Sequence, residues 1–174
     1  MPHKSLRYTT FKTRWGYFGL AGSDRALGRT CLPMPDCRKA ESCLLNDLPS
    51  LQYDRDYFRP LQKQVIAYFE GARIDFGPDI PVFTEGFSCF ARLVLAACRQ
   101  VSFGQVVTYS GLAREIARPA AVRAVGNALA KNPLPLIIPC HRVVRSDGKM
   151  GGFSGPGGTA MKKHLLELER PNDC

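Results

Sequence analysis

Apolar positions in the first third of the chain come in short alternating blocks. Residues 6–12, 16–21 and 26–31 place apolar side chains between turn-forming Gly, Ser and Asp residues, a pattern typical of short antiparallel strands. Apolar residues then recur at helical spacing over residues 36–48, which begin with a capping aspartate, and over residues 59–71, which end on a glycine. The pattern predicts a small α+β domain.

Two prolines within residues 76–83 interrupt this pattern and predict a linker. We therefore expect one domain over residues 1–79, with a structural role, and a second over residues 80–174, which would carry the function. A chain of 174 residues is long enough for two small domains.

The pattern becomes helical after the linker. Helices are predicted over residues 86–100, 108–117 and 120–131, with a turn at residues 102–107 and a break at Arg118-Pro119, since proline ends a helix. The two helices on either side of this break form a candidate helix-turn-helix. An ordinary helical hairpin fits the same pattern equally well.

The helix predicted over residues 120–131 would have one apolar face and one face of mostly small side chains. Val122, Val125, Gly126 and Leu129 form the apolar face. The opposite face carries small residues where charged ones are usual, so a partner can approach this helix closely. A nucleic-acid groove would fit such a face, with Arg123 inserted at its flank. The residues of this open face are Ala120, Ala124, Asn127, Ala128 and Lys131.

The formal net charge is +9, which attracts polyanions, of which nucleic acid is the common one. Residues 84–174 hold 12 basic and 6 acidic residues, against 12 basic and 9 acidic in residues 1–83, so the second domain is the expected nucleic-acid face. No apolar run approaches the roughly 20 residues that span a bilayer. We expect a cytoplasmic protein, or a nuclear one in a eukaryote, without a membrane partner.

Seven cysteines show no framework spacing and are expected as reduced thiols in such a compartment. Cys31, Cys37 and Cys43 are spaced more widely than the usual metal-binding pairs, and no histidine lies near them in the sequence. We therefore expect no metal and no other cofactor.

The residues most informative for chemistry follow an apolar segment, residues 134–138, that is predicted as a short strand. Cys140 is followed at once by His141. A cysteine nucleophile reacts as its thiolate, and a nearby histidine with the charges of Arg142 and Arg145 would favour that anion. By adjacency alone, a buried structural cysteine beside an uninvolved histidine explains the pair better.

A last helix is predicted from Thr159, which can cap it, with Met161, Leu165 and Leu168 on its inner face. Glu169 lies about 40° from Leu165 by the helical period. Its carboxylate would face the interior and need a partner there. A solvated side chain at a fraying helix end fits the position equally well.

These residues occur with the order and spacing of a known family. Pro139-Cys140-His141-Arg142-Val143 resembles the active-site motif of the O6-alkylguanine-DNA alkyltransferases, also called methylated-DNA–protein-cysteine methyltransferases. Upstream, Val107-Thr108-Tyr109, Arg123-Ala124-Val125-Gly126 and Lys131-Asn132-Pro133 resemble that family's DNA-binding helices and hinge. Downstream, residues 152–158, Lys162 and residues 165–169 resemble its substrate loop and last helix. The resemblance runs from about Phe87 to Glu169, whereas residues 1–83 match the family's variable N-terminal domain in size and coarse pattern alone.

The resemblance implies an α+β fold with a small, RNase H-like N-terminal α/β domain and a mostly helical C-terminal domain. The latter would hold a helix-turn-helix similar to a winged helix. The implied function is DNA repair by direct damage reversal: O6-alkylguanine is flipped out of double-stranded DNA, and its alkyl group moves irreversibly to Cys140. The protein would bind damaged DNA as a monomer or cooperatively. It would act once, because water does not hydrolyse a thioether and the sequence offers no second thiol beside Cys140.

The resemblance also assigns catalytic roles. Cys140 would accept the alkyl group, and His141 would act as a base through a water while Glu169 orients and polarises it. Tyr109 would donate its phenol proton toward the leaving guanine. Asn132 would hold the turn between the recognition helix and the active-site segment.

Other residues would meet the DNA and the flipped base. Arg123 would fill the gap left by the flipped nucleotide, and the further DNA contacts would come from Tyr109, Ala124, Asn127 and Lys131. Val143, Phe153 and Ser154 would line the base pocket. The chain departs from many relatives at Phe153, where a tyrosine hydroxyl is lost, and at Ala130, where a basic residue can occur.

Two other function classes stand beside this one. A DNA-binding module without chemistry, like the alkyltransferase-like proteins, resembles the same half of the chain but lacks the cysteine, which is present here at Cys140. A cysteine hydrolase would need an oxyanion site and would leave the helix-turn-helix and Arg123 unexplained.

Overall fold

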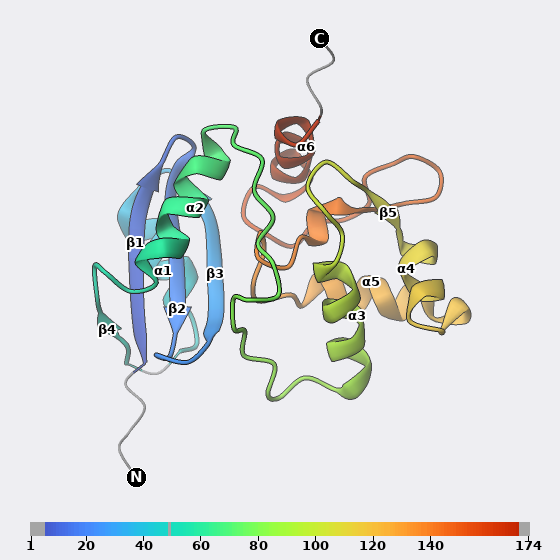
Figure 1. The fold of residues 1–174 in the computed structure, drawn as a ribbon, viewed down its shortest axis with the longest axis horizontal. Coiled ribbons are helices and arrows are strands. Elements are labelled where there is room, and N and C mark those ends of the chain that lie inside the picture. Colours follow the sequence, from blue (N-terminus) through green and yellow to red (C-terminus); the bar gives the residue numbers. More distant parts are fainter. Residues whose placement is uncertain (1–5, 49, 171–174) are drawn as a thin grey trace. The chain divides into compact units, whose positions relative to one another are not determined.

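The computed structural model describes residues 6–48 and 50–170 (Figure 1). The chain divides into two compact units, Met1–Ile74 with Pro78–Phe83, and Asp75–Gly77 with Thr84–Cys174. The first unit is built on a small sheet and the second is mainly helical, which confirms the mixed α+β class.

The first unit holds a sheet of four strands in the order β3-β2-β1-β4. The strands β1 (Arg7–Thr13), β2 (Gly16–Gly22) and β3 (Leu27–Met34) pair antiparallel, as the alternating pattern predicts. The third strand runs three residues further than expected. A fourth strand, β4 (Gln52–Tyr53), pairs parallel to β1 and was not predicted, because two exposed residues carry no alternation.

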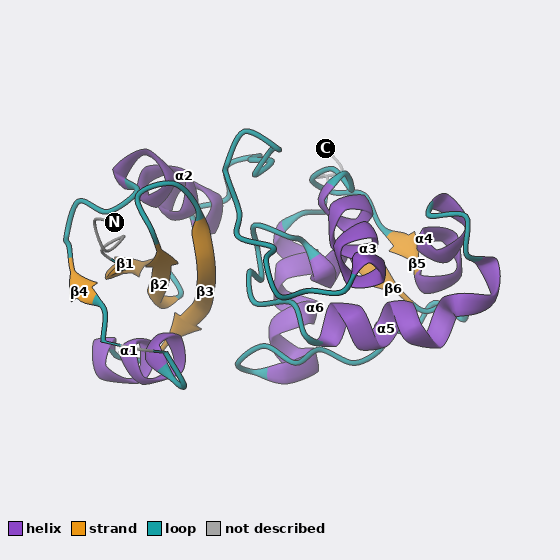
Figure 2. Ribbon diagram, turned by 90° about the horizontal axis from the view of Figure 1, so that it is seen from below, coloured by secondary structure: helices purple, strands orange, loops and turns teal. Residues whose placement is uncertain are grey.

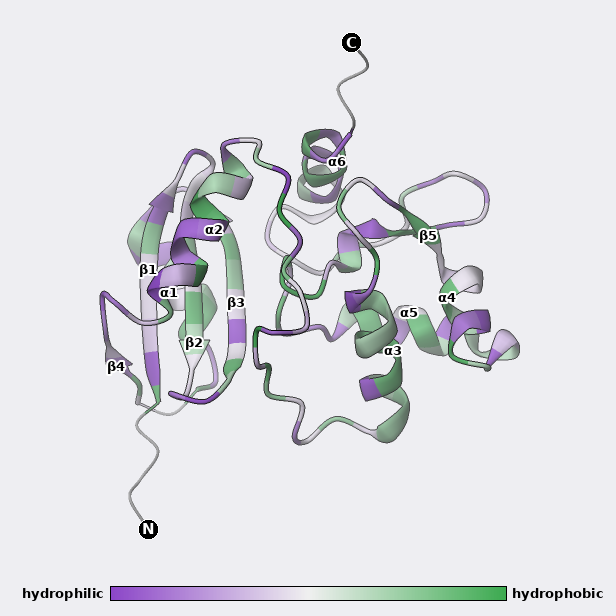
Figure 3. Cartoon of the chain, in the orientation of Figure 1, coloured by the Kyte–Doolittle hydropathy of each residue, from purple (hydrophilic) through white to green (hydrophobic). Residues whose placement is uncertain are grey.

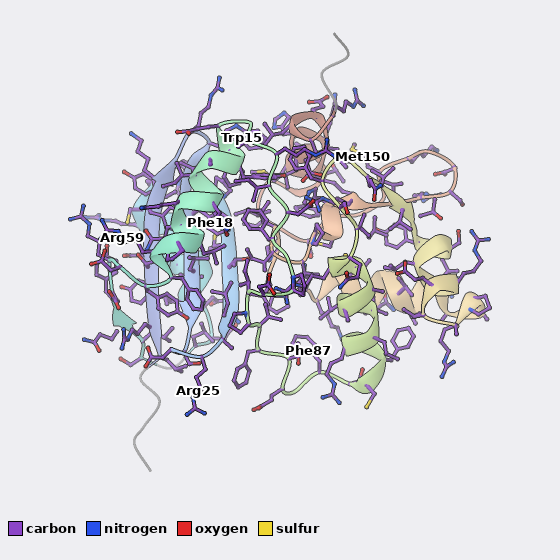
Figure 4. All side chains as sticks on the ribbon, in the orientation of Figure 1. Trp15, Phe18, Arg25, Arg59, Phe87 and Met150 are labelled. Carbon is purple, nitrogen blue, oxygen red and sulfur yellow. The ribbon has the colours of Figure 1, made fainter. Side chains whose placement is uncertain are left out.

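Two helices cover this sheet. The helix α1 (Cys37–Leu45) begins after Asp36, whose side chain accepts a hydrogen bond from the backbone N–H of Lys39 at 2.9 Å. The helix α2 (Arg59–Phe69) lies on the opposite face of the sheet (Figure 2). Apolar residues follow strand β2 (Figure 3). Phe18 on that strand, labelled in Figure 4, packs against Phe69 of α2 with ring centroids 6.0 Å apart.

The proposed linker is not a free connection, which corrects the expectation for residues 76–83. The backbone N–H of Leu27 donates to Pro81 O, and Phe83 N–H donates to Leu27 O, both at 2.8 Å. Residues 78–83 therefore satisfy polar backbone groups of β3 and pack with the first unit. Residues 75–77 pack with the second unit instead.

The second unit contains the predicted helices. They are α3 (Cys89–Arg99), α4 (Tyr109–Glu115), α5 (Val122–Ala130) and α6 (Gly158–Leu168). The helix α5 packs against both α3 and α4. Two short strands, β5 (Val107–Thr108) and β6 (Val143–Val144), pair in parallel, and two 3-10 helices, η1 (Pro119–Ala121) and η2 (Cys140–Arg142), precede α5 and β6.

Two local expectations in the second unit were wrong. Residues 134–138 form a tight turn rather than a strand: Ile138 N–H donates to Leu134 O at 2.8 Å, and Leu136 has a φ of 78°. The last helix is preceded by Gly157, with a φ of 81°, and not capped by Thr159. In both places a left-handed residue, which the apolar pattern does not reveal, redirects the chain.

Within residues 6–48 and 50–170, no helix has the length and apolar character needed to cross a bilayer.

Candidate active site

Cys140 lies at a cavity of about 700 Å³ in the second unit, within the range of roughly 300–1,000 Å³ usual for small-ligand sites. The cavity is bounded by the start of α4, by α5 and by the loop after β6, the loop marked by Met150 in Figure 4. Six residues assigned from the resemblance line it: Tyr109, Arg123, Asn127, Cys140, Phe153 and Ser154.

Asn132 organises the turn that presents Cys140. Its amide nitrogen donates to Ile138 O at 2.9 Å and to Cys140 Sγ at 3.3 Å, and its oxygen accepts from Leu134 N–H at 3.0 Å. One side chain therefore fixes both ends of the turn and contacts the sulfur. This geometry matches the turn-holding role expected of Asn132.

The electrostatic surroundings of Cys140 differ from the expectation. Burial, the largest effect, raises the pKa of the Cys140 thiol above its usual value, while the hydrogen bond from Asn132 and the charge of Lys162 oppose the rise. Arg142 is instead paired with Glu169 and Asp75, and Arg145 with Asp147. The resting sulfur is therefore a thiol, and a base is needed to make the thiolate.

His141 and Glu169 supply a buried acid–histidine pair. His141 Nε2 lies 2.9 Å from Glu169 Oε1, and the two side chains are 0% and 2% exposed. Burial alone would raise the pKa of Glu169, but hydrogen bonds from His141 and Arg142 lower it to about 2. Burial lowers the pKa of His141, against the opposing effect of Glu169. At neutral pH the pair is therefore a neutral imidazole beside a carboxylate.

This charge state identifies the basic nitrogen of His141. An ionised carboxylate can only accept, so the proton of the neutral ring resides on Nε2 and is donated to Glu169. The lone pair is then on Nδ1, which is buried and has no hydrogen-bond partner among the described residues. A buried, unpaired acceptor is suited to take a proton from the active site.

Arg142 is a further member of this network, in a role that its position in the sequence did not indicate. Its Nε donates to Glu169 Oε2 at 2.8 Å and one terminal nitrogen donates to Oε1 at 2.9 Å, a bidentate pair. Both side chains are almost completely buried. The arginine thus holds the carboxylate that holds His141.

Tyr109 lies between α5 and the loop after β6. An added Cβ at Gly126 would lie 3.9 Å from its ring, and one at Gly151 would lie 3.0 Å from its ring and 3.1 Å from its hydroxyl oxygen. Burial and the proximity of Cys140 raise the pKa of Tyr109, so its phenol keeps a proton to donate.

Lys162 is the second site residue without an assigned role. It is fully buried, its Nζ donates to Val143 O at 2.6 Å, and it lies 5.7 Å from the centroid of the Tyr109 ring. Helical periodicity places it within about 20° of Glu169 on α6, so the inward face of that helix was the signal that could have revealed it. Val143, expected at the base pocket, is buried with its carbonyl engaged by Lys162 and is not among the residues that line the cavity.

The outer face of α5 is open as expected, with one exception. Arg123, Ala124, Asn127 and Lys131 are exposed, whereas Ala128 is 8% exposed and belongs to the inner face. At the end of α5, Ser154 Oγ donates to Ala130 O at 2.8 Å and fastens the substrate loop to the helix. Arg123 and Asn127 therefore connect the open face with the cavity that contains Cys140.

Across the described ranges, no three His, Cys, Asp or Glu side chains are grouped so as to hold a metal ion.

Comparisons with known proteins agree with this geometry. Residues 89–171 match the family model described as 6-O-methylguanine DNA methyltransferase, DNA binding domain. The methylated-DNA–protein-cysteine methyltransferase of Metallosphaera sedula is 38% identical over 94% of this chain and 93% of its own length. The protein of the same name from Methanosarcina acetivorans is 32% identical over 94% and 98%.

Solved structures resemble the whole fold. A crystal structure of the Mycobacterium tuberculosis O6-methylguanine methyltransferase superposes with a TM-score of 0.75 at 29% identity and covers 97% of this chain and 96% of that one. A structure of Mycobacterium tuberculosis OGT in complex with DNA gives 0.75 at 30% identity, covering 94% and 92%. The chain therefore belongs to the methylated-DNA–protein-cysteine methyltransferase family, whose members repair DNA by alkyl transfer.

Proposed function

We propose that this protein reverses O6-alkylguanine damage in double-stranded DNA by moving the alkyl group to Cys140 Sγ. The observation that carries the proposal is the arrangement of Cys140 at a cavity beside the exposed face of α5, with the next residue, His141, in a buried pair with Glu169. The protein would act as a monomer in the compartment that holds the DNA.

The pair α4 and α5 would act as the helix-turn-helix, with α5 as the recognition helix. Its exposed face offers small side chains together with Arg123 and Lys131, so a groove can approach closely while the charges meet phosphate. Arg123 would enter the stack in place of the flipped nucleotide. The extruded base would then occupy the cavity, because O6 inside a duplex is out of reach of the sulfur.

The chemistry is a displacement at the alkyl carbon. The thiol proton moves through a water to His141 Nδ1, and the charge that forms on the imidazole is stabilised by Glu169. The sulfur lone pair forms the S–C bond as the C–O6 bond breaks, and the electron pair of that bond leaves with the guanine. Tyr109 donates a proton toward the base, so that guanine leaves neutral.

A thioether at Cys140 would be the end of the reaction. Cys98 on α3 is a second thiol close enough to Cys140 for the charge of Cys140 to raise the pKa of Cys98. Burial raises the pKa of Cys98 far above its usual value, so it stays protonated and a poor nucleophile. The protein would therefore be consumed in one turnover.

The test is the intact mass of the protein after incubation with a duplex that carries one O6-methylguanine. We expect a gain of one methyl group, mapped to the peptide with Cys140, and no gain with an undamaged duplex or with Cys140→Ser. A slower gel mobility of the duplex without a mass gain of the protein would indicate a DNA-binding module without transfer activity. Release of methanol without a mass gain would indicate a hydrolase.

A further inference from the structure

We propose that Asp75 is a positioning residue of the active site, acting through Arg142 and Glu169 on the base His141. The inference rests on the proposed alkyl transfer and adds a residue from outside residues 89–171, the part of the chain that matches the family model. Asp75 belongs to the three residues, Asp75–Gly77, that pack with the second unit although the chain on either side of them packs with the first.

Asp75 makes two hydrogen bonds within the second unit. Its Oδ1 accepts from one terminal nitrogen of Arg142 at 3.1 Å and from the backbone N–H of Phe103 at 2.5 Å. A further hydrogen bond fixes the segment Asp75–Gly77, because the side chain of Arg99 donates to Gly77 O at 2.7 Å. A side chain distant in sequence is thereby fixed against the arginine next to His141.

The contacts of Arg142 divide between Glu169 and the Asp75 side. Its Nε and one terminal nitrogen hold the two oxygens of Glu169, while the other terminal nitrogen contacts Asp75 Oδ1 and Val101 O. The planar guanidinium cannot turn without breaking both sets of bonds. Asp75 therefore fixes the orientation of the guanidinium plane of Arg142 relative to the carboxylate of Glu169.

Asp75 also balances charge. The charged groups around His141 are Lys162 on α6, Glu169 directly after that helix, and Arg142 in its own turn. Asp75 and Glu169 share the positive charge of Arg142, although Asp75 is half exposed and thus partly screened. Removing the Asp75 charge leaves Arg142 a stronger positive neighbour of His141. The imidazole then becomes a weaker base.

The test uses the full chain and free O6-benzylguanine, which reacts without DNA binding or base flipping. Alkylation rates are measured against pH for wild type, Asp75→Asn and Asp75→Ala, each normalised to the fraction that can be alkylated. Asp75→Asn keeps an oxygen acceptor but loses the charge, and Asp75→Ala loses both. Glu167→Gln removes an exposed carboxylate from α6 that pairs with Lys163, and serves as the matched control.

We expect Asp75→Ala to lower the plateau rate about tenfold, a part of what a positioned base contributes. The acid limb of its profile should move to lower pH. Asp75→Asn should show the same shift of the acid limb with a smaller loss of rate, and Glu167→Gln should match wild type.

A wild-type rate and an unshifted acid limb in both Asp75 variants would overturn the proposal. The proposal would also be overturned if the rate fell in proportion to the thermal midpoint while the acid limb of the pH–rate profile stayed in place, because a purely structural role predicts that result. Failure of wild type itself to gain a benzyl group would contradict the proposed function instead.

Discussion

The side-chain nitrogen of Asn132 lies 3.3 Å from Sγ of Cys140 and donates to it. The same amide closes the turn that leads to the cysteine through Ile138 O and Leu134 N–H. Position of the sulfur and stability of the turn therefore depend on one side chain.

Replacing Asn132 by alanine should lower both stability and reactivity. Three hydrogen bonds are lost, at about 1 kcal/mol each, so the free energy of unfolding should fall by about 2–3 kcal/mol. The sulfur also loses a donor that lowers its pKa, so alkylation by free O6-benzylguanine should slow. Urea unfolding and intact mass measure the two effects. Asn127→Ala, on the exposed face of α5, should keep its free energy of unfolding, and an equal loss there would contradict the assignment.

The buried Glu169 makes stability depend on pH in a defined window. Its folded pKa of about 2 lies below the ordinary value of 4.5, so its contribution is present above pH 4.5 and is lost as the pH falls toward 2. Glu169→Gln removes the buried one of the two carboxylates that pair with Arg142 and should cost roughly 3–5 kcal/mol at pH 7. The difference from wild type should then shrink as the pH falls through that window.

Unfolding by urea at a series of pH values checks this behaviour. Glu167→Gln should follow the wild-type curve throughout, because its carboxylate is exposed. A gap between Glu169→Gln and wild type that stays constant from pH 7 to pH 2 would show that the ion pair with Arg142 is not its source.

A substitution at Arg123 should distinguish DNA binding and base flipping from the alkyl-transfer reaction itself. It is exposed on α5 and lines the cavity, so Arg123→Ala should slow repair of a damaged duplex by about tenfold or more, because insertion into the stack supports the flipped state. Reaction with free O6-benzylguanine should change little. Arg38→Ala, which removes the same charge from α1, controls for net charge. Equal losses on both substrates would place Arg123 in the fold or the chemistry instead.

The sequence was most informative where periodicity or spacing reports the structure directly. Strands β1 to β3 and helices α3 to α6 follow their apolar patterns. The position of Glu169 on the inward face of α6 follows from its distance to Leu165, and burial decided between the two alternatives left open there.

Other features depend on contacts that no local pattern encodes. The apolar residues around Leu136 predict a strand from the sequence. They form a turn instead, because Leu136 has a left-handed backbone conformation and Asn132 hydrogen-bonds to the turn. The helical period placed Ala128 on the open face of α5, which was wrong, because packing buries it on the inner face. Asp75 lies 67 residues from Arg142, so its contact with the active site appears only once the fold is known.

Gly151 offers a test of how the substrate loop and Tyr109 fit together. Its φ is 73°, and an added Cβ would lie 3.0 Å from the Tyr109 ring and 3.1 Å from the hydroxyl oxygen. Gly151→Ala therefore meets two penalties: a left-handed backbone that costs an L-residue about 1–2 kcal/mol, and a contact that forces the phenol to move. Because Tyr109 is the expected proton donor to guanine, the rate should fall more than stability alone explains.

Gly152→Ala is the matched control, since an added Cβ there meets no atom within 4 Å. Rates with free O6-benzylguanine and thermal midpoints should be measured for both variants and for Tyr109→Phe. We expect Gly151→Ala to slow alkylation several-fold, Gly152→Ala to stay near wild type, and Gly151→Ala to add little further loss in the Tyr109→Phe background. Such non-additivity is expected when two changes disturb the same contact. If the two losses simply add, the glycine acts on the loop without moving the tyrosine.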